Sequence, residues 1–162
     1  MKLHVRLCVL LCVVMAPAAV SPARPVPAWS YEKLVGGADL VVIATPTATK
    51  DTKEPAVLPG VSRPGPDGQP APVPAVGVET TFAVQAILKG EAKDLKQFVV
   101  YHLREGDAQA QAPAPNGPML VKFDVKAGHK YLLFLKREGG RYVSVTGQTD
   151  PAIGVKDLGT YP

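Results

Sequence analysis

Two apolar runs joined by the pair Gly139-Gly140 place the strongest constraint on how this chain folds. They occupy residues 129–145, HKYLLFLKREGGRYVSV. A two-residue glycine loop between apolar runs predicts a β-hairpin, because the tight turn that matches strand twist needs positive φ at its central positions. This register pairs Glu138 with Arg141, and it indicates a fold built on antiparallel strands.

Side chains alternate between the two faces of the predicted hairpin. One face carries the apolar residues that we expect to line the core, which are Leu132, Phe134, Val143 and Val145. The opposite face carries Tyr131, Leu133 and Leu135 in its first half. Because that face is also strongly apolar, we expect another element to cover it.

Residues 1–23 have the pattern of a secretory signal peptide. Lys2 and Arg6 give a positive start, and the apolar run that follows them is short for a bilayer span. Small residues come next, and we expect cleavage after Ala23. The mature chain, residues 24–162, is then expected to be a single secreted or periplasmic domain without an integral membrane segment.

Both cysteines, Cys8 and Cys12, lie inside this signal. The mature chain therefore offers no disulfide, no thiolate nucleophile and no cysteine ligand for a metal. The signal also holds two of the 18 lysines and arginines, so 16 remain against 14 acidic residues and the net charge falls from +4 to +2. A charge this small gives no basis for binding nucleic acid or an anionic membrane surface.

Further segments have the patterns of β-strands. Residues 39–45, DLVVIAT, form a continuous apolar run that is typical of a strand buried on both faces. Residues 76–88 alternate between apolar and polar positions and predict a long strand, which a polar turn connects to another strand over residues 95–103. Residues 119–123 are expected to form a short strand before the hairpin.

Proline and glycine mark where these elements end. Ser30 is a typical N-cap for a short helix that Gly36-Gly37 end. Residues 55–75 contain seven prolines and residues 106–118 contain three. Because proline removes an N–H donor and fixes φ, we expect both segments to be flexible Pro-rich loops.

Taken together, these patterns predict a mainly β fold, namely a small five-stranded antiparallel barrel with a short N-terminal helix and two Pro-rich loops. Closure of a barrel removes exposed edges and covers both faces of a strand such as residues 39–45. After the hairpin, Asp150-Pro151 indicate a final helical turn, with an extended tail through Ile153 and Val155 as the alternative.

A family resemblance supports the same fold. It is carried by a helix leading into residues 38–44, by residues 81–90 and, after a polar gap, by residues 128–135. On these segments the chain resembles a broad group of uncharacterised bacterial secreted proteins, with a spacing similar to the OB-like barrel of tissue inhibitors of metalloproteinases and netrins. The resemblance covers the chain from about Tyr31 to Val145, and it implies the fold rather than an activity.

The resemblance does not extend to a mechanism. The animal inhibitors of this fold chelate the protease zinc through an amino-terminal cysteine, and the mature chain has none. An OB-like topology does not by itself imply nucleic-acid binding, since function has to be argued from a site. We therefore expect no nucleic-acid partner.

Few residues have the arrangement that catalysis or metal binding requires. His102 and His129 are the histidines of the mature chain, and they lack the spacing of a zinc site. None of Ser30, Ser62 and Ser144 lies in a Gly-x-Ser-x-Gly elbow. The sequence thus assigns no catalytic residue, no metal ligand and no cofactor, and it leaves the binding residues unassigned.

Positive charge gathers in the last third of the chain, at Lys122, Lys126, Lys130, Lys136, Arg137 and Arg141. Ordinary solvated strand edges account for such a pattern, because lysine on an edge deters pairing with another chain. The alternative interpretation is a surface for an anionic wall polymer or a partner protein.

Three functional hypotheses follow, and one of them, a single-strand nucleic-acid binder, rests on fold analogy alone and is disfavoured by export and by the net charge of +2. The first is an exported non-enzymatic binding or interaction module for a protein or an envelope polymer. The alternative is a secreted enzyme with a dispersed site around His102, which requires that histidine to lie in a cleft and to be hydrogen-bonded to an Asp or Glu.

Overall fold

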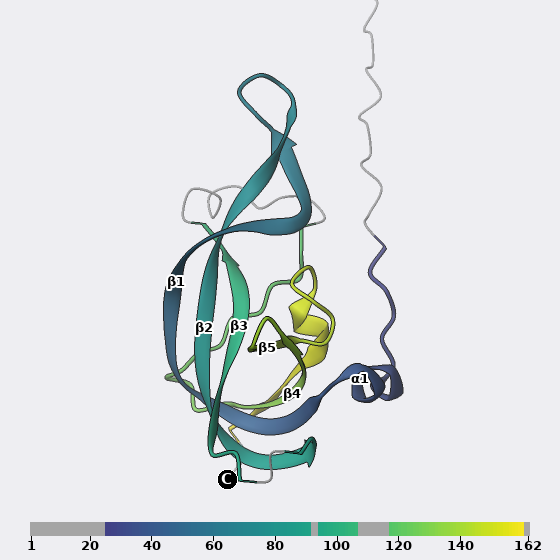
Figure 1. The fold of residues 1–162 in the computed structure, drawn as a ribbon, viewed down its shortest axis with the longest axis vertical. Helices are drawn as coiled ribbons and strands as arrows, with labels where there is room; N and C mark the ends of the chain where they lie inside the picture. Colours follow the sequence, from purple (N-terminus) through teal and green to yellow (C-terminus); the bar gives the residue numbers. More distant parts are fainter. Residues whose placement is uncertain (1–24, 92–93, 107–116, 161–162) are drawn as a thin grey trace, which may run out of the picture.

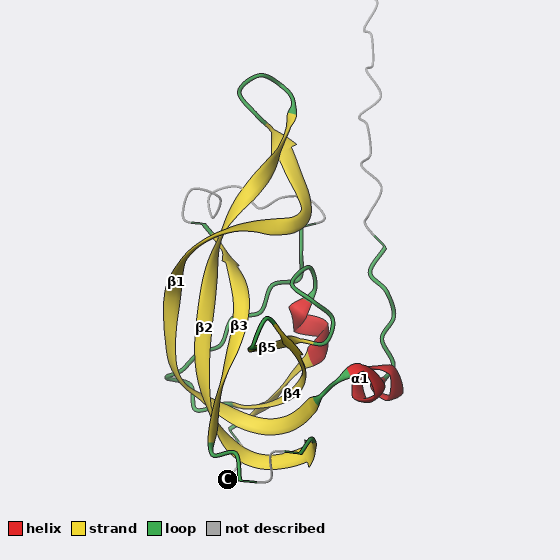
Figure 2. Ribbon diagram, in the orientation of Figure 1, coloured by secondary structure: helices red, strands yellow, loops and turns green. Residues whose placement is uncertain are grey.

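The computed structural model describes residues 25–91, 94–106 and 117–160 of the chain, and these are mainly β with one short α-helix (Figures 1 and 2). The elements in chain order are α1 (Tyr31–Gly37), β1 (Leu40–Pro64), β2 (Pro70–Lys89), β3 (Gln97–Glu105), β4 (Lys130–Glu138), β5 (Arg141–Ser144), the 3-10 helix η1 (Pro151–Gly154) and β6 (Val155–Gly159).

The strands form one mixed sheet in the order β1-β2-β3-β5-β4-β6, with an additional pairing between β1 and β4. The expectation of five antiparallel strands is wrong in two respects. The sheet has a sixth strand, because β6 pairs with β4 from Leu133 to Lys130. It also has a parallel contact, because β5 runs alongside β3 where Val100 meets Tyr142.

The hairpin of β4 and β5 has the predicted register. Gly139 and Gly140 adopt φ values of 57° and 80°, and Glu138 pairs with Arg141. Its two faces are both buried, but the larger core cluster lies on the Leu133 and Leu135 side rather than on the Phe134 side. On that side Leu133 and Leu135 belong to the same cluster as Phe82, Phe98 and Phe123, whereas Phe134 packs with Leu34 of α1.

Helix α1 covers the other face of β4. Ser30 Oγ accepts a hydrogen bond from Lys33 N at 3.2 Å, which confirms the predicted N-cap. Leu34 is buried against Phe134 and Val145, so this short helix is held by packing rather than by its own propensity. Figure 1 shows α1 at the side of the sheet, next to the beginning of β1.

Residues 55–75, expected to be a flexible loop, instead form the far ends of β1 and β2. They make a twisted two-stranded ribbon, called the arm below, that projects from one end of the sheet (Figure 1). Its root is anchored because Leu58 and Val73 are buried against Leu103 of β3. The prediction of a loop was wrong for residues 55–64 and 70–75, and only the tip between them is irregular.

The prolines of the arm explain how a Pro-rich segment forms strands. Pro70, Pro72 and Pro74 occur at every second residue, so their nitrogen atoms point to the same side of β2. All three are paired with residues of β1. Because proline has no N–H to donate, their nitrogens must face away from β1, and the ladder between the two strands keeps its hydrogen bonds.

Two other expectations concern the middle of the chain. Residues 119–123 form no strand, although Phe123 is buried in the main core cluster. Of the second Pro-rich loop, expected over residues 106–118, residues 107–116 lie outside the described part of the chain. Within the described part, no helix has the length and apolar character needed to cross a membrane.

Gly77 marks the point where β2 passes closest to its neighbours. A Cβ atom at this position would lie 2.5 Å from Thr52 Oγ1 and 2.7 Å from the Tyr101 hydroxyl oxygen. We therefore expect Gly77→Ala to lower the free energy of unfolding by about 1–3 kcal/mol through overpacking, as measured by urea unfolding. Gly36→Ala is the control, because nothing lies within 4 Å of its Cβ position. Equal stability of the two variants would contradict this view of Gly77.

Candidate binding site at His102

A pocket of about 450 Å³ lies at the root of the arm, between β1, β2, β3 and the segment that precedes β4. We call it the His102 pocket. Its walls are mostly apolar, and the apolar side chains come from Val78, Leu120, Val121 and Phe123. Pockets of this size and composition are typical of sites that take a small ligand or one group of a larger partner.

His102 stands in the wall of this pocket with 5% of its surface exposed. Its Nε2 atom lies 2.9 Å from Thr80 Oγ1, and Thr80 Oγ1 lies 3.0 Å from Thr49 Oγ1. The other ring nitrogen, Nδ1, is buried, and among the described residues no side chain bonds to it. The ring of Phe123 lies almost perpendicular to the imidazole, with 5.2 Å between centroids.

Burial makes His102 a neutral side chain at neutral pH. Desolvation lowers the pKa of His102 from 6.5 to about 4, and the backbone of Leu103 opposes this only in part. The side chain that bonds to its ring is Thr80 and not a carboxylate, and the other contact is a hydrogen bond with the backbone of Leu103. An enzyme with a site around His102 requires that histidine to lie in a cleft and to be hydrogen-bonded to an Asp or Glu. The structure has the cleft but not the carboxylate partner.

The charged groups at the edge of the pocket are largely neutralised. Arg104 Nη2 donates to Asp51 Oδ2 at 2.6 Å, and Arg104 Nε donates to Asp51 Oδ1 at 3.1 Å. This bidentate pair holds the pKa of Asp51 below its ordinary value, chiefly through the hydrogen bond from Arg104. The pair joins β3 to β1 where the arm begins.

A second bidentate ion pair connects the β4–β5 hairpin to β1, close to the start of the arm. Arg141 Nη1 donates to Glu54 Oε2 at 2.9 Å, and the guanidinium lies over the Tyr101 ring at 5.1 Å from its centroid. The hydrogen bond from Arg141 lowers the pKa of Glu54. Because Glu54 stands immediately before the arm, this contact fixes the arm relative to the β4–β5 turn.

The predicted cluster of positive charge is divided among several such contacts. Arg141 pairs with Glu54, Lys136 Nζ lies 3.1 Å from Glu138 Oε2, and Arg137 Nη2 donates to the Tyr142 hydroxyl at 3.2 Å. Arg141, Lys136 and Arg137 of the hairpin therefore lie beside acidic or aromatic partners. This arrangement favours solvated strand edges over a surface for an anionic polymer.

The other residues considered from the sequence lie apart from the His102 pocket. His129 Nδ1 contacts Asp157 Oδ2 at 2.8 Å, Ser30 caps α1, and Ser144 Oγ donates to Pro151 O at 3.0 Å. Ser62 lies on the arm. Among the residues that the structure describes, no group of three or more His, Cys, Asp or Glu side chains is placed to hold a metal ion.

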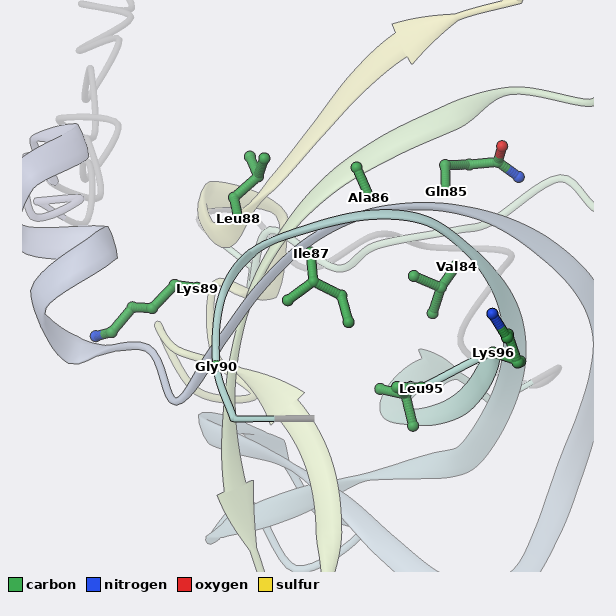
Figure 3. A pocket seen from close by; sticks show the side chains of 9 residues that line it. All are labelled: Val84, Gln85, Ala86, Ile87, Leu88, Lys89, Gly90, Leu95 and Lys96. Atoms are coloured by element: carbon green, nitrogen blue, oxygen red, sulfur yellow. The ribbon is translucent and has the colours of Figure 1, made fainter. Parts of the chain in front are cut away.

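A second hollow, of about 400 Å³, lies under the curved end of β2 and the turn that follows it. Figure 3 shows Val84, Ile87 and Leu95 pointing into the curve, while Leu88 points away from it. Lys89 Nζ donates to Val35 O at 2.7 Å. This hollow has no buried polar group without a partner among the described residues, so it offers less specificity than the His102 pocket.

Thr80 and Phe123 are two of the residues of this site that the sequence did not single out. Thr80 is fully buried, and its position on the apolar face of an alternating strand was the available signal. A polar residue on a core face requires a buried partner, and His102 on the neighbouring strand is that partner. Phe123 gave no such signal, because its segment forms no regular element.

The fold and the pocket together define a mainly β protein with a candidate binding site at His102. Comparison with protein-family models gave no match, and a search of curated proteins gave none either. The function is therefore argued from the site.

Proposed function

We propose that this protein is an exported, non-enzymatic binding module that recognises a protein or an envelope polymer at the His102 pocket. The observation that carries the proposal is the pocket itself, about 450 Å³ with mostly apolar walls and a deeply buried, neutral histidine. Apolar walls with one well-placed polar group are suited to recognition. A neutral imidazole bonded to a threonine is poorly suited to general-base catalysis at neutral pH.

The proposal includes an OB-like barrel as the scaffold. In its support, the pairings run from β1 through β2, β3, β5 and β4 and return to β1. Proteins with this architecture commonly bind their ligands on the β2–β3 face and at the loops between β1 and β2 and between β4 and β5. The His102 pocket is lined by residues of β1, β2 and β3 and by residues 120–123, and it lies beside the arm, which is the connection between β1 and β2. Export is supported by the signal-like residues 1–23.

A charged residue placed in the pocket tests this proposal. Val121→Arg brings a guanidinium to an apolar wall, and we expect it to reduce capture of the partner from an envelope extract at least about 10-fold, since a desolvated charge without a counter-ion is costly. Val99→Arg is the matched control, because Val99 is 39% exposed and lies outside the pocket. Immobilised residues 24–162 and the two variants would be compared by quantitative mass spectrometry. Equal capture by all three would refute the role of the pocket.

A shortened arm tests whether the arm also contributes to recognition. Removing all of residues 55–75 would delete Leu58 and Val73, which are part of the core. Replacing residues 62–72 with an Asn-Gly turn keeps both side chains and removes only the outer ribbon. Loss of a species that Val121→Arg still captures would assign that species to the arm instead of the pocket.

A further inference from the structure

Strand β1 has an open edge beside the His102 pocket. It pairs with β2 from Val41 to Pro64, but with β4 only from Leu40 to Ala44. Beyond Ala44, no strand in the described part of the chain pairs with that side of β1. Residues 47–51 are each exposed, so this stretch is not covered. A free strand edge presents N–H and C=O groups to which another extended chain can pair.

The register of β2 shows which backbone groups of β1 face this edge. Val84 N–H donates to the carbonyl group just before β3, so the backbone groups of Val84 point toward β3. Thr80 and Val78 share this orientation, because the direction of the backbone groups alternates along a regularly paired strand. Their partners in β1 are Thr49 and Asp51, which therefore turn their own N–H and C=O groups away from β2 and toward the open edge.

The same two residues of β1 connect the open edge to the pocket. The side chains of Thr49 and Asp51 line the His102 pocket, together with apolar residues such as Val78 and Val121. In an added antiparallel strand, the residue opposite Thr49 would have its side chain on the same face, with about 5 Å between Cβ atoms. That side chain would enter the pocket while its own backbone bonds to Thr49. Backbone pairing would then supply affinity, and the pocket would supply specificity.

Interruptions in β1 limit how long an added strand can be. The register of β1 against β2 shifts between Pro46 and Ala48, and it shifts again between Asp51 and Pro55. Such irregularities end regular pairing and protect an edge from long foreign strands. The regular part of the open edge is therefore short, from Ala48 to Asp51. It suits a short extended segment of another protein better than extensive pairing between two copies of this chain.

We infer that the open edge of β1 at Thr49 and Asp51 takes a short extended segment of a partner protein, which adds an antiparallel strand and places one uncharged apolar side chain in the His102 pocket. A charged side chain would lose its hydration there without a free counter-ion, since Arg104 already pairs with Asp51. The inference rests on the proposed function, because it specifies a peptide strand as the partner of the same pocket.

Short peptides test the inference on the unaltered mature protein, residues 24–162. The probes are acetyl-Thr-Thr-Leu-Thr-Thr-amide, its versions with alanine or aspartate in the centre, and the leucine peptide N-methylated at leucine. We expect the leucine peptide to bind with a Kd of roughly millimolar and to shift the amide resonances of Thr49 and Asp51 in an NMR titration. The alanine and aspartate peptides should bind about 10-fold more weakly, since one fills less of the pocket and the other brings a charge. The N-methyl peptide should also bind about 10-fold more weakly, because it cannot donate to Thr49.

A proline at the open edge tests the same contact from the side of the protein. Thr49→Pro removes the outward N–H and keeps the pairing with β2, so we expect both peptide binding and capture of the partner from an envelope extract to fall about 10-fold. Thr49→Val is the matched control, because it removes the hydroxyl that contacts Thr80 but retains the N–H, and binding should stay within about 2-fold. Urea unfolding checks that both variants fold. If the proline variant does not fold, the N-methyl peptide decides the question on the unaltered protein.

Several results would overturn the inference. Equal binding of the leucine and N-methyl peptides would refute strand addition, and equal binding of the leucine and alanine peptides would refute insertion into the pocket. Absence of binding by every peptide, or capture unaffected by Thr49→Pro, would refute both. A dimer that Thr49→Pro abolishes would assign the edge to a second copy. If Val121→Arg reduces capture in any of these cases, the proposed function stands and only strand addition fails. If capture is unaffected by Val121→Arg, the proposed function fails whatever the peptides do.

Discussion

Replacing Phe82 with alanine is expected to lower the free energy of unfolding by about 3–5 kcal/mol. Phe82 is fully buried on β2, stacks on Phe98 with 5.5 Å between ring centroids, and meets Phe123 edge-on at 4.8 Å. Removing the ring leaves a cavity that rigid strands cannot fill, in addition to the loss of apolar burial and of the aromatic contacts. Urea unfolding at pH 7 would measure the change.

Two variants calibrate this experiment. Phe82→Leu retains much of the apolar volume, so we expect it to be considerably less destabilising than the alanine variant. Leu88→Ala removes an apolar side chain that is 59% exposed on the same strand, and we expect a change within about 0.5 kcal/mol. A Phe82→Ala protein as stable as Leu88→Ala would show that this aromatic cluster is not the centre of the core.

Acidification is expected to destabilise the protein through His102. The folded pKa of about 4 lies below the ordinary value of 6.5, so between these values the unfolded chain binds more protons than the folded one. The stabilising effect of keeping His102 neutral is complete above pH 6.5 and is lost as the pH falls toward 4. Between pH 7 and pH 5 we expect a loss of about 2 kcal/mol in the free energy of unfolding.

Substitution of each histidine isolates this effect. His102→Gln removes the titrating group, so its stability should change by about 2 kcal/mol less than that of the unaltered protein between pH 7 and pH 5. His129→Gln is the control, because His129 lies at the surface beside Asp157, and this variant should retain the loss. The measurement stops at pH 5 because the carboxyl of Asp51, which Arg104 stabilises in its charged form, contributes in more acidic solution. A full loss in His102→Gln would assign the pH dependence to other groups.

The sequence predicted the elements whose signals are local. The hairpin followed from Gly139-Gly140, and both glycines have the positive φ that such a turn needs. The short helix followed from Ser30, whose hydroxyl caps α1. The alternating pattern of residues 76–88 identified the inner part of β2, including the buried Phe82. In each case the residues that set the structure are neighbours in the sequence.

Features that depend on distant partners were not predictable in the same way. Strand β6 is only five residues long, and it exists because β4 offers an edge to which it can pair. The Thr80–His102 contact depends on the register between β2 and β3, which neither strand specifies alone. The arm differs from the expected loop because a high proline content does not by itself prevent strand pairing. The spacing of those prolines, at every second residue, was the informative property.

That spacing has a consequence for self-association of the protein. A ribbon that projects from a sheet normally presents two rows of free backbone groups, on which other chains can nucleate fibrils. In the arm, Pro70, Pro72 and Pro74 occupy successive outward-facing positions of β2 and supply no N–H for a foreign strand. One edge of the projecting arm therefore offers no N–H groups at these positions to a strand of another copy. That edge needs no covering subunit to prevent pairing.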